Sequence, residues 1–226
     1  MIVNLAKILF LRLTQRKVVL MVLFVTVILT ISCSRQALVT TYYLLDYYPN
    51  AVNQNLLYEE PIPYRVQVVN FKIPRSFDSI RIIARFSSHQ INYYRYSLWA
   101  VRPQIAAADL LVQHINAYGL FAKCQREFLE ERPEYEITGE IFQIERFESE
   151  KYSAAHLKMN LELYDRENND LLIRHAFDRE NEIPTGNMSI FAKAISDIIN
   201  EETEIFLEKV AMHFQEPDGD SLQVLD

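Results

Sequence analysis

The amino-acid sequence predicts an α+β fold in which two helices pack on one face of an antiparallel sheet. Two kinds of periodicity support this class. In several segments apolar and polar residues alternate with period two, as expected for strands with one buried face. In two other segments apolar residues recur every three to four positions, as in helices that bury one side. The order along the chain is strands, a helix, strands again and a second helix.

The segments that precede the first helix have the composition of strands and turns. Residues 40–48 are rich in β-branched and aromatic side chains and end at Pro49, which predicts a strand. Residues 49–63 contain several prolines and asparagines and predict a loop. Further strands are expected at residues 64–71, 79–86 and 90–98. The short polar segment between the last two suits a hairpin turn.

The first helix is predicted at residues 101–118. Its apolar stripe consists of Ile105, Ala108, Val112 and Ile115. Pro103 suits the first helical turn, and Gly119 suits the position just after the last turn. Residues 120–123 then predict a short strand.

Three long strands are expected to follow as an antiparallel meander with one polar face. They lie at residues 135–147 and 152–166 and from residue 171 to at least 177. In the first of them, strict alternation divides the side chains into two sets. The sets are Ile137, Gly139, Ile141 and Gln143 on one face and Thr138, Glu140, Phe142 and Ile144 on the other.

The last predicted helix runs over residues 188–214, with Asn187 or Ser189 as its N-cap. The α+β domain therefore spans residues 40–214. Residues 215–226 contain a proline, a glycine and several acids, and we expect them to form a mobile acidic tail.

The N-terminus has the parts of a bacterial lipoprotein signal. Four basic residues precede an apolar run over residues 18–31, and no acidic residue occurs before Asp46. The run is shorter than the ~20 residues that span a bilayer. Ser32 and Cys33 follow it, as a small residue and a lipidated cysteine do at a lipoprotein cleavage point. We therefore predict a signal peptide at residues 1–32 and a lipidated leader at residues 33–39.

Cys33 is expected to carry S-diacylglycerol and N-acyl groups such as palmitate, which hold the protein to a membrane. The alternative is an uncleaved inner-membrane anchor that also uses residues 8–13, because Thr30 stands where such signals usually have leucine. Ser34 follows the cysteine. In bacteria with two membranes an Asp at that position commonly retains the protein at the inner membrane. The predicted location is therefore the periplasmic face of the outer membrane.

Charge is distributed unevenly over the chain that follows the signal. Residues 34–103 carry more basic than acidic side chains, whereas residues 104–226 are strongly acidic. So acidic a protein is a poor partner for nucleic acid, and we expect no nucleic-acid binding. The asymmetry indicates either a basic face for anionic headgroups or an acidic partner, or else arginines that are solvated around the strand ends.

Motifs for catalysis are not evident in the sequence. The chain has only four glycines, so a glycine-rich phosphate loop is not expected, and its five histidines form no metal-binding pair. Cys124 is a lone thiol once Cys33 is acylated, and its place in a short apolar strand predicts a buried, inert side chain. We predict that the protein is not an enzyme and holds no metal and no cofactor beyond the lipid groups on Cys33.

Aromatic residues gather in the first half of the chain, and three of them are candidates for an interface: Tyr42, Tyr43 and Trp99. Tyr and Trp combine a large apolar area with a polar group, a property that interfaces use. The alternative is that they alternate between the core and the surface of the sheet.

Three segments together resemble the ABC-type transport auxiliary lipoprotein family. They are YYLL just after the lipid anchor, WA with Pro103 at the start of the first helix, and TGEIFQIE at residues 138–145. The resemblance covers residues 40–212. Members accompany MCE-type lipid transport systems between the two membranes of diderm bacteria. A departure is the arginine-rich run over residues 72–85, which points to a different partner surface.

This resemblance implies a fold similar to the amino-terminal domain of TolB, no catalysis, and a docking role beside an MCE-type protein. It also implies self-association, because members can assemble into rings. Only Cys33 would have a defined chemical role, and Tyr43 and Trp99 would be structural or interfacial. Two other functions stay open: an outer-membrane lipoprotein that activates a peptidoglycan synthase, and a periplasmic enzyme.

Overall fold

The computed structural model describes residues 17, 20, 21, 23, 39–49, 60–149 and 152–215. Contacts divide the chain into two units, residues 1–39 and 40–226. The fold below is that of the second unit. The predicted signal peptide is described only at scattered positions, and Cys33 and the predicted tail after Gln215 lie outside the described residues. Within the described part, no helix combines the length and the hydropathy that crossing a membrane requires.

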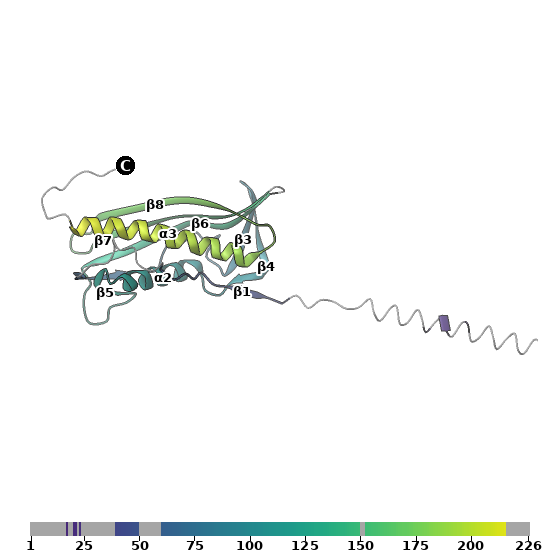
Figure 1. The fold of residues 1–226 in the computed structure, drawn as a ribbon, viewed down its shortest axis with the longest axis horizontal. Helices are drawn as coiled ribbons and strands as arrows, with labels where there is room; N and C mark the ends of the chain where they lie inside the picture. Colours follow the sequence, from purple (N-terminus) through teal and green to yellow (C-terminus); the bar gives the residue numbers. More distant parts are fainter. Residues whose placement is uncertain are drawn as a thin grey trace, which may run out of the picture. The chain divides into compact units, whose positions relative to one another are not determined.

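The described part of the second unit contains eight strands and two helices (Figure 1). They are β1 (Thr41–Tyr43), β2 (Ile62–Val68), β3 (Arg81–Ser87), β4 (Gln90–Trp99), α2 (Pro103–Tyr118), β5 (Phe121–Gln125), β6 (Tyr135–Glu148), β7 (Ser153–Asp165), β8 (Asp170–Ile183) and α3 (Met188–Gln215). The predicted order of strands and helices is confirmed.

The predicted strand at residues 40–48 is too long. β1 ends at Tyr43, after which the chain leaves the sheet and passes the helices. There the backbone N–H of Asp46 donates to Ser196 Oγ at 3.1 Å, and Tyr47 Oη lies 3.2 Å from His114 Nδ1. These contacts with α3 and α2 replace the strand pairing that the local composition predicts.

All eight strands form one curled sheet, but the prediction of an antiparallel sheet is wrong in part. The order is β1-β4-β3-β6-β2-β5, with β7 and β8 added along the other edge of β6. The β3–β4 hairpin and the β6–β7–β8 meander are antiparallel. The pairs β1–β4, β2–β5, β2–β6 and β3–β6 are parallel. The sheet is therefore mixed.

Strand β6 organises this arrangement because two strands share one of its edges. Val66 of β2 pairs beside Tyr135 near its start, and Ala84 of β3 pairs beside Arg146 near its end. Lys72 forms a bridge with Glu140 between them. These strands are distant in the sequence, so periodicity within a segment gives no information about their direction.

One apolar core lies between the sheet and the two helices. Helix α3 packs against β7 and β8, and α2 packs against β5 and β2 (Figure 1). Phe191 and Phe206 of α3 and Ile115 of α2 are fully buried in the same cluster as the inward side chains of the strands. Both helices therefore cover the same apolar core, as predicted.

The helix ends follow the predicted capping chemistry. Gly119 ends α2 with a φ of 61°, in the left-handed region that favours glycine. Asn187 is the N-cap of α3, because its Oδ1 accepts from the backbone N–H groups of Ser189 at 2.9 Å and Ile190 at 3.3 Å.

A β-bulge changes which side chains of β6 face the core. The register with β7 shifts between Ile141 and Gln143, so Phe142 is an extra residue. Beyond it Ile144 pairs with Leu157 on the core side. The predicted alternation therefore holds up to Ile141 and is inverted afterwards. Ile144, Arg146 and Glu148 lie on the face of the sheet that carries the apolar core, while Gln143, Glu145 and Phe147 lie on the opposite face.

Burial of His114 makes stability dependent on pH. The side chain has no exposed surface, and burial lowers its pKa to about 4. In the unfolded chain a histidine titrates near pH 6.5, so between these values the unfolded state binds more protons. The free energy of unfolding is therefore expected to fall by about 2 kcal/mol between pH 7 and pH 5 through this group.

The measurement is urea unfolding at both pH values, with His114→Gln as the comparison. Glutamine cannot take up the proton, so the variant should lose that part of the pH dependence. Equal pH dependence in the two proteins would show that His114 does not contribute.

Candidate functional site

Strand β1 places the three predicted interface residues in different environments. In the parallel pairing with β4, Tyr43 lies beside Trp99 and Tyr42 beside Leu98. Trp99 is 2% exposed and packs near Phe191. Trp99 is therefore too buried in this fold to contact a partner protein. Its side chain packs the end of β4 against α3. Tyr43 is half-buried against the core.

Tyr42 has the accessible position that an interface requires. It is 59% exposed, and two more apolar side chains nearby in the chain, Leu44 and Tyr48, are also exposed. We call these three residues the β1 patch. Exposed apolar groups of this kind are typical of surfaces that contact a partner or a membrane.

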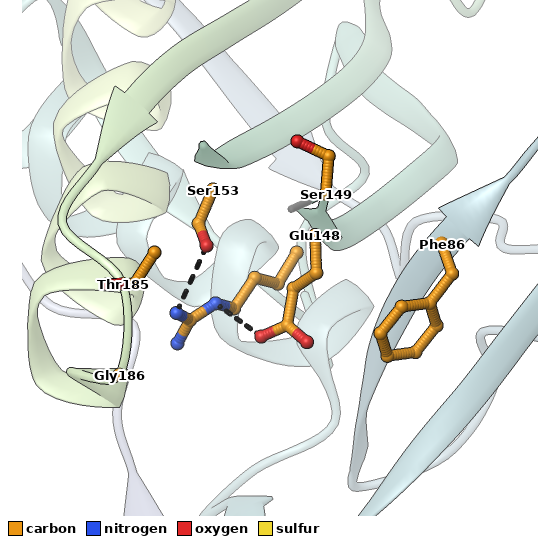
Figure 2. A pocket seen from close by; sticks show the side chains of 7 residues that line it. Phe86, Glu148, Ser149, Ser153, Thr185 and Gly186 are labelled. Atoms are coloured by element: carbon orange, nitrogen blue, oxygen red, sulfur yellow. Dashed lines mark hydrogen bonds and ion pairs between the residues drawn. The ribbon is translucent and has the colours of Figure 1, made fainter. Parts of the chain in front are cut away.

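A hollow of about 620 Å³ opens where β3 and β6 end, β7 begins, and the chain passes from β8 to α3 (Figure 2). Its walls are Phe86, Arg146, Glu148, Ser149, Ser153, Thr185 and Gly186. A second hollow of about 470 Å³ shares Arg146, Glu148 and Gly186 with it. The second hollow extends toward Tyr43 and Tyr94 and reaches Met188 at the first turn of α3.

Arg146 and Glu148 are the charged residues that line both hollows, and Arg146 is 2% exposed. Its Nε lies 3.0 Å from Glu148 Oε1, although the N–H does not point at that oxygen, and its Nη2 donates to Ser153 Oγ at 3.5 Å (Figure 2). Glu148 also accepts a hydrogen bond from the hydroxyl of Tyr94. Burial raises the pKa of Tyr94, so this hydroxyl stays protonated and donates.

Sequence reasoning missed Arg146 and Glu148, because a strict period of two does not reveal the bulge at Phe142. The signal that could have found them is the adjacent pair Glu145 and Arg146 within an otherwise apolar strand segment, since one of two consecutive strand residues has to face the core. A buried arginine is rare unless it is paired.

The face of the sheet opposite Arg146 carries a separate ionic network. Glu145 is fully buried and accepts from Arg85, while His156 Nδ1 lies 3.3 Å from it. His156 Nε2 lies 2.8 Å from Asp178 Oδ1. Hydrogen bonds to these two carboxylates raise the pKa of His156. Because both of its ring nitrogens face carboxylates, His156 has no free nitrogen to act as a general base.

Cys124 has the buried position that its sequence context predicts. It is 3% exposed, and burial raises the pKa of its thiol to about 12. Because the thiolate is the reactive species, a thiol reagent at pH 7 should modify it about 1,000-fold more slowly than a free cysteine. The test uses a Cys33→Ser variant, folded and in urea. Rapid labelling of the folded protein would contradict the buried placement.

Metal ligands do not converge anywhere in the described part of the chain. Among residues 39–49, 60–149 and 152–215, no group of three histidine, cysteine or carboxylate side chains is arranged to hold a metal ion. The polar side chains found together instead pair with one another, as in the network of Glu145.

Comparisons with solved structures show that the fold occurs in other proteins. A DUF330 protein from Xanthomonas campestris has a TM-score of 0.64 and 16% sequence identity, covering 78% of this chain and 96% of its own. An uncharacterized protein has a TM-score of 0.59 and 12% identity, covering 78% of this chain and 99% of its own. At these identities the likeness concerns the fold alone. No curated protein sequence matches the chain.

A family comparison gives the identity that these fold relatives leave open. The sequence profile of the ABC-type transport auxiliary lipoprotein component matches residues 43–204, which include nearly all of the sheet and most of α3. The chain therefore belongs to the family of ABC-type transport auxiliary lipoprotein components.

Proposed function

We propose that the protein is a non-enzymatic, lipid-anchored subunit of an MCE-type lipid transport system. It docks at the periplasmic face of the outer membrane and bridges toward an MCE-type protein. The family match over residues 43–204 is the observation that carries this proposal, because the family is that of auxiliary lipoprotein components of ABC-type transport.

The β1 patch supports docking at the membrane that holds Cys33. Tyr42 is the ninth residue after Cys33 in the sequence. An extended chain covers at most about 3.5 Å per residue, so Tyr42 stays within about 32 Å of the lipidated cysteine. Tyrosine and leucine side chains at such a distance can contact headgroups or a partner bound there.

A role without catalysis is supported by the two ionisable clusters of the site. His156 is paired with carboxylates at both ring nitrogens, and the Nε side of Arg146 lies against Glu148. Neither arrangement holds a nucleophile next to a free base, which covalent catalysis requires.

The anchor is tested with Cys33→Ala in the native host. The variant should lose palmitate labelling and leave the outer-membrane fraction. If it still incorporates palmitate and fractionates as processed protein, the lipoprotein assignment fails.

The docking role is tested with Tyr42→Glu, and Leu129→Glu is the matched control. Leu129 is 95% exposed and lies between β5 and β6. We expect the Tyr42 variant, but not the control, to lose co-purification with an MCE-type protein and to transfer phospholipid more slowly between the membranes. Co-purification with a peptidoglycan synthase instead would favour the activator function.

Self-association is part of the proposal. Within the described strands, β1, β5 and β8 each pair on one side only, which leaves edges for contact between copies. Sedimentation of the processed protein in detergent should show a defined oligomer. A strictly monomeric protein would remove this part of the proposal.

A further inference from the structure

We propose that the hollow around Arg146 binds the phosphate group of a phospholipid headgroup. The inference deepens the proposed function, because it names the chemical class of ligand. The contacts of Arg146 do not depend on the docking role of the β1 patch, so an experiment can contradict one proposal and leave the other intact.

The first step is the unfinished pairing of a buried guanidinium. Arg146 is 2% exposed, and a charge so far from water normally has well-directed partners. The carboxylate of Glu148 lies next to Nε of Arg146, but the N–H does not point at it. Nη2 donates to Ser153 through a long, weak hydrogen bond of 3.5 Å. The buried Nε has no hydrogen-bond partner, and the one side-chain hydrogen bond of Arg146 to a described residue is that of Nη2. At least three of the five N–H donors of Arg146 are therefore left for a ligand.

The second step is the position of Glu148, which leaves the outer edge of the guanidinium uncovered. This carboxylate lies on the Nε side of Arg146 and is also bound by the Tyr94 hydroxyl. The two Nη groups are therefore the part of Arg146 that a ligand in the hollow can reach. Figure 2 shows the two contacts as dashed lines, with Thr185 and Gly186 on the opposite wall.

The remaining walls suit an anion with an organic substituent. Ser153 and Thr185 supply hydroxyls, and the start of the 28-residue helix α3 adds the positive end of its dipole. Asn187 already caps the N–H groups of Ser189 and Ile190, so the helix contributes its field rather than donors. Phe86 and Met188 offer apolar surface next to the polar centre.

A phosphate group fits these features better than a small inorganic anion alone. The planar guanidinium matches two phosphate oxygens at once. Hollows of about 620 and 470 Å³ exceed what a bare ion fills, and they leave room for the glycerol of a headgroup. Tyr43 links the second hollow to β1, the strand that follows the predicted lipid leader.

The experiment is calorimetric titration of the processed lipoprotein, with its whole domain and tail, in detergent. The probes are inorganic phosphate, glycerophosphoglycerol, dihexanoyl phosphatidylglycerol and acetate. We expect saturable binding of phosphate at millimolar concentration and at least tenfold tighter binding of the glycerophosphoglycerol and phosphatidylglycerol probes. Acetate should bind at least tenfold more weakly than phosphate.

Two variants test the site without relying on Arg146 alone. Arg146→Gln should weaken binding of all phosphate probes by tenfold or more. Thr185→Glu changes an exposed residue, so the fold should be kept while the added charge repels the ligand. Arg174→Gln is the control, because its exposed side chain pairs with Glu162 away from the hollow, and it should change the affinity less than twofold.

Several results would overturn the inference. No binding of any phosphate probe at millimolar concentration would do so, as would equal binding of acetate. Binding of phosphatidylglycerol that survives both Arg146→Gln and Thr185→Glu would show an apolar site instead. Binding of inorganic phosphate alone would assign the hollow to the free ion and overturn the headgroup. Normal co-purification with an MCE-type protein in the variants that lose phosphate binding would leave the docking proposal intact.

Discussion

Replacing Glu202 with alanine is expected to lower the free energy of unfolding by about 3 kcal/mol, because it breaks a buried ionic cluster between α3 and β8. Glu202 is 4% exposed. Its Oε1 accepts from Arg179 Nη1 at 2.6 Å, and its Oε2 accepts from His175 Nε2 at 2.8 Å. Without the carboxylate, the buried imidazole of His175 loses its acceptor, and the half-buried guanidinium of Arg179 keeps only the exposed Glu201.

The protonation state of His175 agrees with this arrangement. Burial is the main cause that lowers its pKa, so the imidazole is neutral near pH 7. Lys209 donates to Nδ1 at 3.1 Å, which leaves the proton on Nε2 to face Glu202. The unfolded chain takes up this proton at a higher pH than the folded one, so stability contributed here declines as the pH falls below about 6.5.

Urea unfolding at pH 7, followed by circular dichroism, measures the effect of Glu202→Ala. The matched control is Asp197→Ala on the same helix, where an exposed carboxylate accepts from Lys193 at 2.8 Å. An exposed pair of this spacing contributes about 0.5 kcal/mol or less. The cluster would have no structural importance if both variants lost the same stability.

Replacing Gly139 with valine is expected to cost about 3 kcal/mol, because the core has no space for a side chain at this position. A Cβ atom on Gly139 would lie 2.8 Å from Cγ and Cδ1 of the Phe71 ring. Phe71 is 4% exposed and cannot turn aside into solvent. The β6 backbone therefore approaches the aromatic ring as closely as only glycine permits.

A double-mutant cycle with Phe71→Leu tests this explanation. The smaller side chain should make room, so the combined loss should be at least about 1 kcal/mol smaller than the sum of the single losses. Gly119→Ala is the control for glycine itself, because nothing lies within 4 Å of a Cβ there and only the positive φ opposes it. Its expected cost is about 1 kcal/mol. Additive losses at Gly139 and Phe71 would contradict the steric explanation.

The secondary structure could be predicted well because its causes are local. The segment after Pro103 has a helical apolar stripe and ends at a left-handed glycine, and α2 occupies that segment. The long strands β6 and β7 follow from alternation over more than ten residues. Asn187 caps α3 through its own side chain, an interaction between residues two and three positions apart.

The candidate site could not be predicted in the same way. Arg146 faces the core because Phe142 is an extra residue relative to β7, and only the paired strand defines a bulge. Trp99 was a plausible interface residue by type, yet it lies under α3 near Phe191, which is distant in the sequence. Such placements depend on contacts between segments, and periodicity within one segment carries no information about them.

Two levels of information therefore describe this protein. Composition, periodicity and the residues around Cys33 suffice for the order of strands and helices, the expectation of a lipid anchor and the family, because each depends on neighbouring residues. Strand direction, the bulge in β6 and the hollow at Arg146 follow only from the assembled sheet. In that sheet β2 and β3 share one edge of β6, and the register of β6 with β7 determines which of its side chains face the core.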